Sequence, residues 1–211
     1  MYVPAQFKED RVPAMHAMIR NCGLATLVTM TADGLVASHV PLLLEPDPAP
    51  FGTLRGHLAR PNPQARGADP AVEALAIFAG AEGYISPSYY ATKRETGKVV
   101  PTWNYETVHA YGPIRFFDDA DALLDVVTRL TERHEAGRAA PWAVSDAPAD
   151  FVAGMLRGIV GIEIPIARLE GKVKMSQNRP EADRVGVVSG LAADGAGALA
   201  DAVRRATGTV G

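Results

Sequence analysis

Residues 56–64 read GHLARPNPQ and follow a short apolar run, residues 51–54. The run predicts a strand, Phe51 to His57, and the segment after it brings His, Arg, Asn and Gln side chains together. Two prolines fix the backbone φ angle, and arginine offers a planar fork of donors to phosphate oxygens. The stretch therefore indicates either a binding turn for an anionic ligand or an ordinary surface turn rich in Asn and Pro.

Outward from this turn, apolar periodicity predicts many short strands with helices around them. A hairpin signal, TADG at residues 31–34, joins the first two strands, and residues 45–50 and 86–100 are expected to be irregular. This pattern predicts a mainly β fold with peripheral helices (α+β), built as a barrel or a strongly bent sheet. The expected strands are Leu24 to Thr31, Leu35 to Leu44, Phe51 to His57, Ala74 to Phe78, Ala81 to Ile85, Thr102 to Phe116, Val160 to Leu169 and, after a turn at Glu170-Gly171, a short strand to Met175; the expected helices are Asp10 to Cys22, Asp118 to Arg138, one from Pro148, one opening near Pro180, and one around Leu199 and Val203.

Composition excludes several classes of protein. The 211 residues are 47% hydrophobic and 21% charged, enough for a sizeable core. The formal net charge of -3 gives no global electrostatic case for nucleic acid. The single cysteine, Cys22, excludes an internal disulfide and, with no signal peptide or bilayer-length apolar run, favours the cytoplasm. The five histidines form no metal-ligand motif, so no metal site is expected.

Aromatic side chains concentrate in residues 84–111, which hold five of the 6 tyrosines and Trp103. Trp103 stands beside Asn104, and an aromatic plane next to an amide suits a flat heterocyclic ligand. The alternative is that Trp103 and Tyr105 pack in a dimer interface, where such residues are also enriched. Both hold if the ligand lies at the interface.

Residues 172–178 read KVKMSQN and form a third informative segment. On a strand, Lys172 and Lys174 project to one face, and the polar residues that follow precede a helix whose N-terminus attracts anions. The alternative is a solvated strand end with an ordinary helix cap. Ser38-His39 interrupts the second strand, where His39 is either structural or part of a ligand site.

Five motifs in order resemble the PaiB-type family of FMN-binding negative transcriptional regulators. They are MYVP (1–4), GHLARPNP (56–63), YISPSYY (84–90), VVPTWNY (99–105) and KMSQN (174–178), and the resemblance runs from Met1 to about Leu191. It implies an FMN-binding split β-barrel related to pyridoxamine phosphate oxidase, a homodimer with flavin at the subunit interface. It also implies a division into a split-barrel domain with N- and C-terminal helices, residues 1–191, and a C-terminal helical tail, residues 192–211.

The resemblance implies a set of FMN-binding residues but no catalytic residue. His57, Arg60 and Asn62 are expected to hold the phosphate, and Gln64 belongs to the same turn. Ser38, His39 and Ser86 are expected to donate to phosphate, ribityl or ring oxygens. Trp103 and Asn104 of the partner subunit are expected to cover the isoalloxazine, and Lys174, Ser176 and Gln177 to close the site.

Three functions follow as hypotheses. The first is an FMN-binding negative transcriptional regulator, although the sequence shows no helix-turn-helix signature and DNA binding has no support from net charge. The second is an FMN-dependent oxidoreductase or reductase that acts on a small molecule. The third is a haem-binding split barrel, with His39, His57 and His109 as conceivable ligands.

Overall fold

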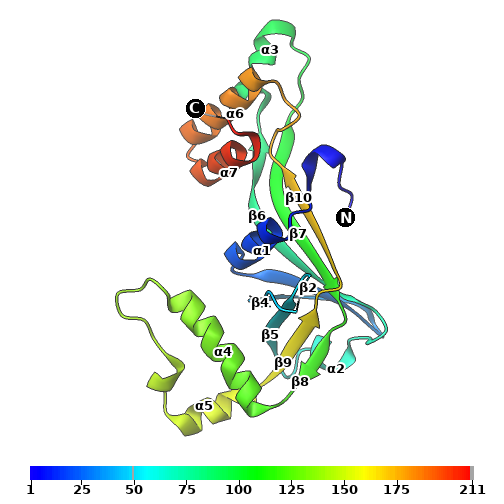
Figure 1. The fold of residues 1–211 in the computed structure, drawn as a ribbon, viewed down its shortest axis with the longest axis vertical. Helices are drawn as coiled ribbons and strands as arrows, with labels where there is room; N and C mark the ends of the chain where they lie inside the picture. Colours follow the sequence, from blue (N-terminus) through cyan, green and yellow to red (C-terminus); the bar gives the residue numbers. More distant parts are fainter. Residues whose placement is uncertain (49, 210–211) are drawn as a thin grey trace. The chain divides into compact units, whose positions relative to one another are not determined.

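The computed structural model describes residues 1–48 and 50–209 (Figure 1). Ala49, in the predicted loop 45–50, and residues 210–211, at the end of the predicted tail, lie outside the described residues. The chain forms two compact units. Unit 1 comprises Met1–Met18, Ala79–Val108 and Glu170–Gly211, and unit 2 comprises Ile19–Phe78 and His109–Leu169.

The strands form two sheets, and two long strands, β6 and β7, contribute residues to both units. The six-stranded sheet has the order β1-β10-β7-β6-β2-β3, and the four-stranded sheet has the order β4-β5-β9-β8. In chain order the strands are β1 (Lys8–Glu9), β2 (Ala25–Thr31), β3 (Gly34–Val40), β4 (Leu43–Glu45), β5 (Thr53–Ala59), β6 (Ala74–Ile85), β7 (Thr102–Gly112), β8 (Arg115–Phe117), β9 (Ile159–Pro165) and β10 (Arg168–Lys174).

In unit 2 the hairpin predicted at residues 31–34 is confirmed. Thr31 pairs with Gly34, the φ of Gly34 is +106°, and the Thr31 hydroxyl donates to the Gly34 carbonyl at 2.9 Å. Residues along β2 alternate between buried and half-buried, as a strand with one face on a core requires. β5 pairs antiparallel with β9 along its whole length, from Thr53 opposite Pro165 to Ala59 opposite Ile159.

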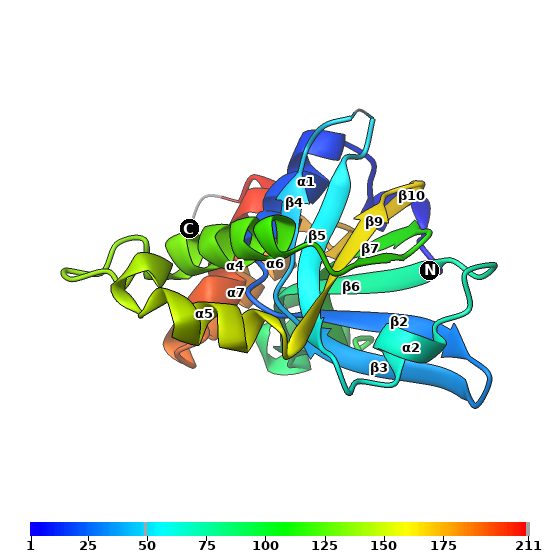
Figure 2. The same cartoon turned by 90° about the horizontal axis from the view of Figure 1, so that it is seen from below.

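The helices of unit 2 include α2 (Gln64–Gly67), α4 (Ala120–Glu135), η3 (Val144–Asp146) and α5 (Ala149–Leu156), and α1 (Val12–Asn21) begins in unit 1 and ends in unit 2. Figure 2 shows α4 and α5 side by side. Leu43, Val126 and Leu130 form a buried cluster in which α4 packs against the four-stranded sheet. The helix predicted from Asp118 is capped one residue later, by Asp119, whose side chain accepts from the backbone N–H of Ala122 at 2.9 Å.

Unit 1 holds η1 (Ala5–Phe7), η2 (Pro87–Tyr89), α3 (Ala91–Thr96), α6 (Glu181–Ala193) and α7 (Gly197–Thr207). Its core joins Ile85, Tyr90 and Met175 to the apolar faces of α6 and α7. The fully buried Asp183 of α6 accepts from the Thr92 backbone N–H at 2.9 Å and from its hydroxyl at 3.0 Å. Two hydrogen bonds therefore compensate for burying this carboxylate and fix the first turn of α3.

The secondary-structure predictions are wrong in three respects. Residues 86–100, predicted to be irregular, contain η2 and α3. The local sequence does not reveal α3, because the side chain that caps it comes from distant α6. The turn predicted at Glu170-Gly171 lies earlier: both residues belong to β10, and a Cβ at Gly171 would lie 2.6 Å from the Glu9 carbonyl oxygen. That glycine therefore marks close packing of β10 on β1 rather than a turn.

The third error concerns where strands start and stop. The predicted strand Leu35 to Leu44 is two strands, β3 and β4, interrupted at Pro41, which has no N–H to give to a sheet. Conversely, the two strands predicted within residues 74–85 are one continuous strand, β6. Gly80 lies inside β6 and is no strand end. Its lack of a side chain leaves room for Glu106, because a Cβ at this position would come within 2.8 Å of the Glu106 Cβ.

Candidate functional site

The turn after β5 is joined to β3 through Asn62. The Asn62 Nδ2 donates to the Ser38 hydroxyl at 2.9 Å, and the Asn62 Oδ1 accepts from the Gln64 backbone N–H at 2.9 Å. Two predicted site residues of this turn, Asn62 and Gln64, therefore meet a third, Ser38, which lies 24 residues before Asn62. The Ser38 hydroxyl keeps its own proton for a further acceptor.

Gln64 anchors this turn. Its side chain is fully buried, and its Nε2 donates to the Leu27 and Val36 carbonyls at 3.2 and 3.0 Å and lies 3.0 Å from the Thr29 hydroxyl. Its Oε1 is buried and has no partner within the described residues. The amide thus fixes the turn to β2 and β3.

Arg60, at the start of the turn, makes three contacts with protein groups. Its Nε donates to the Arg157 carbonyl at 2.8 Å, and one terminal nitrogen donates to the Ile159 carbonyl at 2.7 Å and lies 2.7 Å from the Asp118 carboxylate. A phosphate at Arg60 would have to compete with Asp118. These contacts give Arg60 a clear role in holding the turn against the start of β9.

His57 and His39 lie in different surroundings. The half-buried His57 has a buried Nδ1 with no partner in the described chain, and burial lowers the pKa of its imidazole. His57 is therefore neutral at pH 7. His39 is exposed, and its Nδ1 lies 3.0 Å from the Thr26 hydroxyl across the β2–β3 pair.

In unit 1, Asn104 of β7 and Ser176, just after β10, form a buried pair. The Asn104 Nδ2 donates to the Ser176 hydroxyl at 3.0 Å, and both residues are almost completely buried. Ser176 has a φ of +66°, a left-handed conformation that costs free energy in a residue with a Cβ. The surrounding hydrogen bonds hold this turn in place.

Gln177 and Lys174 flank that turn. The Gln177 Oε1 accepts from the Met175 backbone N–H at 2.6 Å, and its Nε2 donates to the Val173 carbonyl at 2.6 Å. The Lys174 Nζ donates to the Thr102 hydroxyl at 2.6 Å. Burial, with a smaller effect from the Lys172 charge, lowers the Lys174 pKa, and two N–H donors of its ammonium group are left for a ligand.

Trp103 and Ser86, also in unit 1, are accessible. The Trp103 side chain is 47% exposed, its indole N–H donates to the Glu82 carboxylate, and its ring meets Tyr84 edge-on at 6.4 Å between centroids. The Ser86 hydroxyl accepts from the Ser88 backbone N–H at 3.1 Å and caps η2.

The structure therefore brings the predicted residues together in two groups. Ser38, Asn62 and Gln64 contact one another in unit 2, and Asn104 and Ser176 do so in unit 1. Sequence reasoning missed Thr102, the partner of Lys174. Strand periodicity could have found it only if the register between β7 and β10 had been known. The predicted ligands remain these twelve residues: Ser38, His39, His57, Arg60, Asn62, Gln64, Ser86, Trp103, Asn104, Lys174, Ser176 and Gln177.

The groups present suit a flavin mononucleotide chemically. A flavin phosphate calls for charged or hydroxyl donors, of which unit 1 offers Lys174 and unit 2 offers Ser38. A flavin ring system calls for amides and an aromatic face. The partnerless, buried Nδ1 of His57 is a polar atom of the kind that a ligand satisfies. The donor set of the chain thus fits FMN.

Two further observations concern the part of the chain that the structure describes. Its His, Cys, Asp and Glu side chains nowhere form a group of three or more that could hold a metal ion. Within the same residues, every helix is too short or too polar to cross a membrane.

Solved structures share the fold at low sequence identity. A conserved hypothetical protein from Mycobacterium tuberculosis, Rv2991, superimposes with a TM-score of 0.60 at 14% identity, over 85% of this chain and 94% of that one. The FAD and heme binding protein from Mycobacterium smegmatis gives a TM-score of 0.57 at 16% identity, over 79% and 73% of the two chains. The predicted α+β, mainly β fold of the split-barrel class is confirmed.

Sequence comparisons give the family. Residues 1–168 match a family model described as a putative FMN-binding domain. The Bacillus subtilis protease synthase and sporulation protein PAI 2 is 31% identical, with 90% of this chain and 89% of that protein covered. An uncharacterized protein of Emericella nidulans, AN0679, is 36% identical over 97% and 96% of the two chains. The chain therefore belongs to the PaiB-type family of FMN-binding split-barrel proteins, and its cofactor is FMN.

Proposed function

We propose that this FMN-binding protein acts as a negative transcriptional regulator and works as a homodimer. The observation that carries the proposal is its similarity to PAI 2 over nine-tenths of both chains, because the name of that protein links it to protease synthesis and sporulation. The family match supplies the cofactor.

An exposed basic segment in unit 1 supports contact with DNA. Lys93 and Arg94 lie on α3, Lys98 follows it, and all three side chains are exposed. Within the described chain, none of the three forms an ion pair with a carboxylate at 4.0 Å or less. Such cations bind phosphates through charge and release of counterions, so binding weakens as salt rises.

Each unit carries its own candidate groups for contact with FMN. In unit 2, the Ser38 hydroxyl and the Asn62 amide would donate to the ligand, with Arg60 and Gln64 holding the turn that carries Asn62. In unit 1, Lys174 would supply positive charge, and Trp103 an aromatic face. When bound, FMN supplies redox chemistry, and a positive charge near its ring stabilises the reduced anionic form.

Selection from a random duplex DNA library tests the regulator. Purified holoprotein is expected to enrich a common sequence, and binding to it should weaken between low and physiological salt. A variant in which Lys93, Arg94 and Lys98 are replaced by Gln is expected to lose this binding and keep FMN. Replacement of the exposed Arg157 by Gln is the matched control and should bind DNA normally.

The same preparation separates the alternatives. Absence of an enriched sequence at low salt, together with FMN-dependent oxidation of a nicotinamide, would replace the regulator with an oxidoreductase. Sedimentation velocity tests the homodimer, and a single species of monomer mass at micromolar concentration would contradict it.

A further inference from the structure

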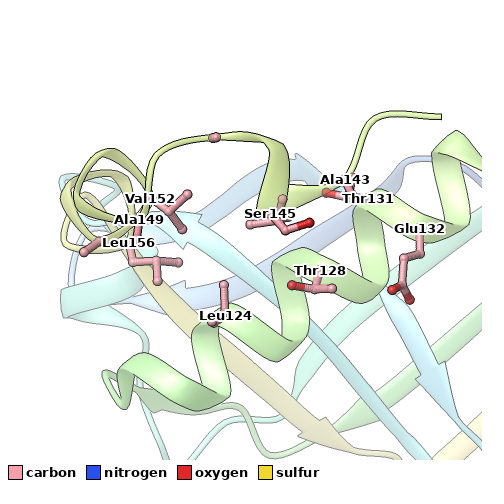
Figure 3. A pocket seen from close by; sticks show the side chains of 12 residues that line it. Leu124, Thr128, Thr131, Glu132, Ala143, Ser145, Ala149, Val152 and Leu156 are labelled. Atoms are coloured by element: carbon pink, nitrogen blue, oxygen red, sulfur yellow. The ribbon is translucent and has the colours of Figure 1, made fainter. Parts of the chain in front are cut away.

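A cavity lies entirely in unit 2, between α4, η3 and α5 (Figure 3). Its volume is about 530 Å³, which lies within the range of small-molecule pockets. The α4 side chains Leu124, Thr128 and Glu132 line it at four-residue spacing, on one face of the helix. None of its lining residues belongs to the predicted flavin set.

The cavity has two chemically different ends. Figure 3 shows Leu124 facing Val152 and Leu156 of α5 at one end. Toward the other end the lining becomes polar, with the Thr128 hydroxyl, Ser145 and finally Glu132. A ligand that fits both ends has an apolar body and a polar head.

The charge at the polar end decides which head group fits. Glu132 is the one charged residue among the described residues that line the cavity, and no cation lies within ion-pair distance of it in the described chain. Among the neighbouring charges, Glu135 pairs with Arg138 at 3.2 Å, and Arg129 pairs with Glu45 and with Asp125. The adjacent Arg133 donates instead to the backbone carbonyls of Arg20, Leu42 and Cys22. The carboxylate of Glu132 therefore attracts a cation and repels an anion.

We propose that this cavity binds a small organic cation with an apolar body, an alkyl- or arylammonium compound. The apolar body would lie among Leu124, Val152 and Leu156, where it leaves water. The ammonium group would lie at the polar end of the cavity and donate to the Glu132 carboxylate. The cavity lining shares no residue with the predicted flavin set, so this proposal does not rest on the function proposed above.

Three probes with one body and different heads test the charge preference: phenylbutylamine, phenylbutanol and phenylbutyrate. In calorimetric titrations of the holoprotein at pH 7, the amine is expected to bind saturably and about fivefold more tightly than the alcohol, the scale of one exposed ion pair. The carboxylate is expected to bind most weakly. Higher salt should reduce the difference between amine and alcohol.

Glu132→Gln removes the charge and keeps the shape, so it should bring amine and alcohol to equal affinity. Glu73→Gln, the same change at an exposed site outside the cavity, should leave the preference unchanged. Val152→Trp fills the apolar end and should abolish binding of all three probes. Ala153→Trp, at an exposed lining position, serves the same purpose if Val152→Trp does not fold.

Two results would overturn the proposal. One is no saturable amine binding, or amine binding that Glu132→Gln leaves unchanged. The other is that Ala153→Trp without probe sediments as a smaller species than the parent protein. Such a result would show that a second copy of the chain occupies the cavity in the parent and that the new side chain displaces it. The flavin absorbance of all variants reports that FMN binding is intact, and thus separates this test from that of the proposed regulator.

Discussion

His57 is the residue at which burial most directly alters proton binding. Its pKa is lowered from the ordinary value of 6.5 because burial penalises the charged imidazolium. Below pH 6.5 the unfolded chain binds a proton that the folded chain resists. The contribution of His57 to the free energy of unfolding is therefore fully present above pH 6.5 and declines as the pH falls toward the folded-state pKa.

We predict that His57→Gln flattens part of this pH dependence. Urea unfolding measures the free energy of unfolding at pH 7 and at pH 5. This free energy should fall more between the two pH values for the parent than for the variant, by no more than about 1.4 kcal/mol per pH unit. His134→Gln, at an exposed histidine, is the control and should follow the parent. Equal slopes for parent and His57→Gln would contradict the prediction.

At the same scale, residue type singled out the side chains of the candidate site more reliably than it predicted their contacts. The motif around residue 62 singled out Asn62 and Gln64, and the structure shows both in one hydrogen-bonded turn with Ser38. That Gln64 is fully buried beneath β2 and β3 was not predictable, because glutamine is usually exposed and its acceptors lie 28 to 37 residues away.

At the scale of elements, α6 contains two glycines where helix propensity alone would favour alanine. A Cβ at Gly186 would collide with the Tyr89 carbonyl oxygen, and one at Gly190 would collide with the Tyr89 ring. These glycines allow η2 to lie directly on α6.

Gly186→Ala is therefore predicted to destabilise the protein by about 1–3 kcal/mol, the scale of an overpacked contact. Gly154→Ala, in α5, is the matched control: its nearest contact would be the Arg157 side chain at 3.6 Å, so it should stabilise by about 1 kcal/mol at most. Chemical denaturation measures both. Stabilisation by Gly186→Ala would show that Tyr89 moves aside at no cost.

At the scale of the whole molecule, FMN binding is linked to folding. A ligand that binds only the folded chain raises the free energy of unfolding by about 2.7 kcal/mol at one hundred times its Kd. We predict this increase with FMN, and a smaller one with riboflavin at the same concentration, because riboflavin lacks the phosphate.

We propose that the FMN phosphate binds near Ser38 and Asn62. Asn62→Asp should then narrow the difference in stabilisation between the two flavins, since a carboxylate at this position would repel the phosphate while still accepting the Gln64 N–H. Gln6→Glu, at an exposed amide, should not. Thermal or urea unfolding with each flavin gives the comparison. An unchanged preference for FMN in Asn62→Asp would place the phosphate elsewhere.

The sequence by itself determined the features that depend on neighbours in the chain. Alternation predicted β2 and β9, a turn motif predicted the hairpin at residues 31–34, and five ordered motifs predicted the family and FMN. These signals are local because strand periodicity and turn conformation depend on adjacent residues.

Only the tertiary structure decided the features that depend on distant partners. Asp183 caps α3 from 91 residues away, Gly171 is a close contact rather than a turn, and Thr102 meets Lys174 across 72 residues. The cavity between α4 and α5 likewise exists only once the two helices pack. The role of such a side chain depends on which groups folding brings next to it. Composition and sequence spacing do not specify these contacts, because the partners are distant in the chain.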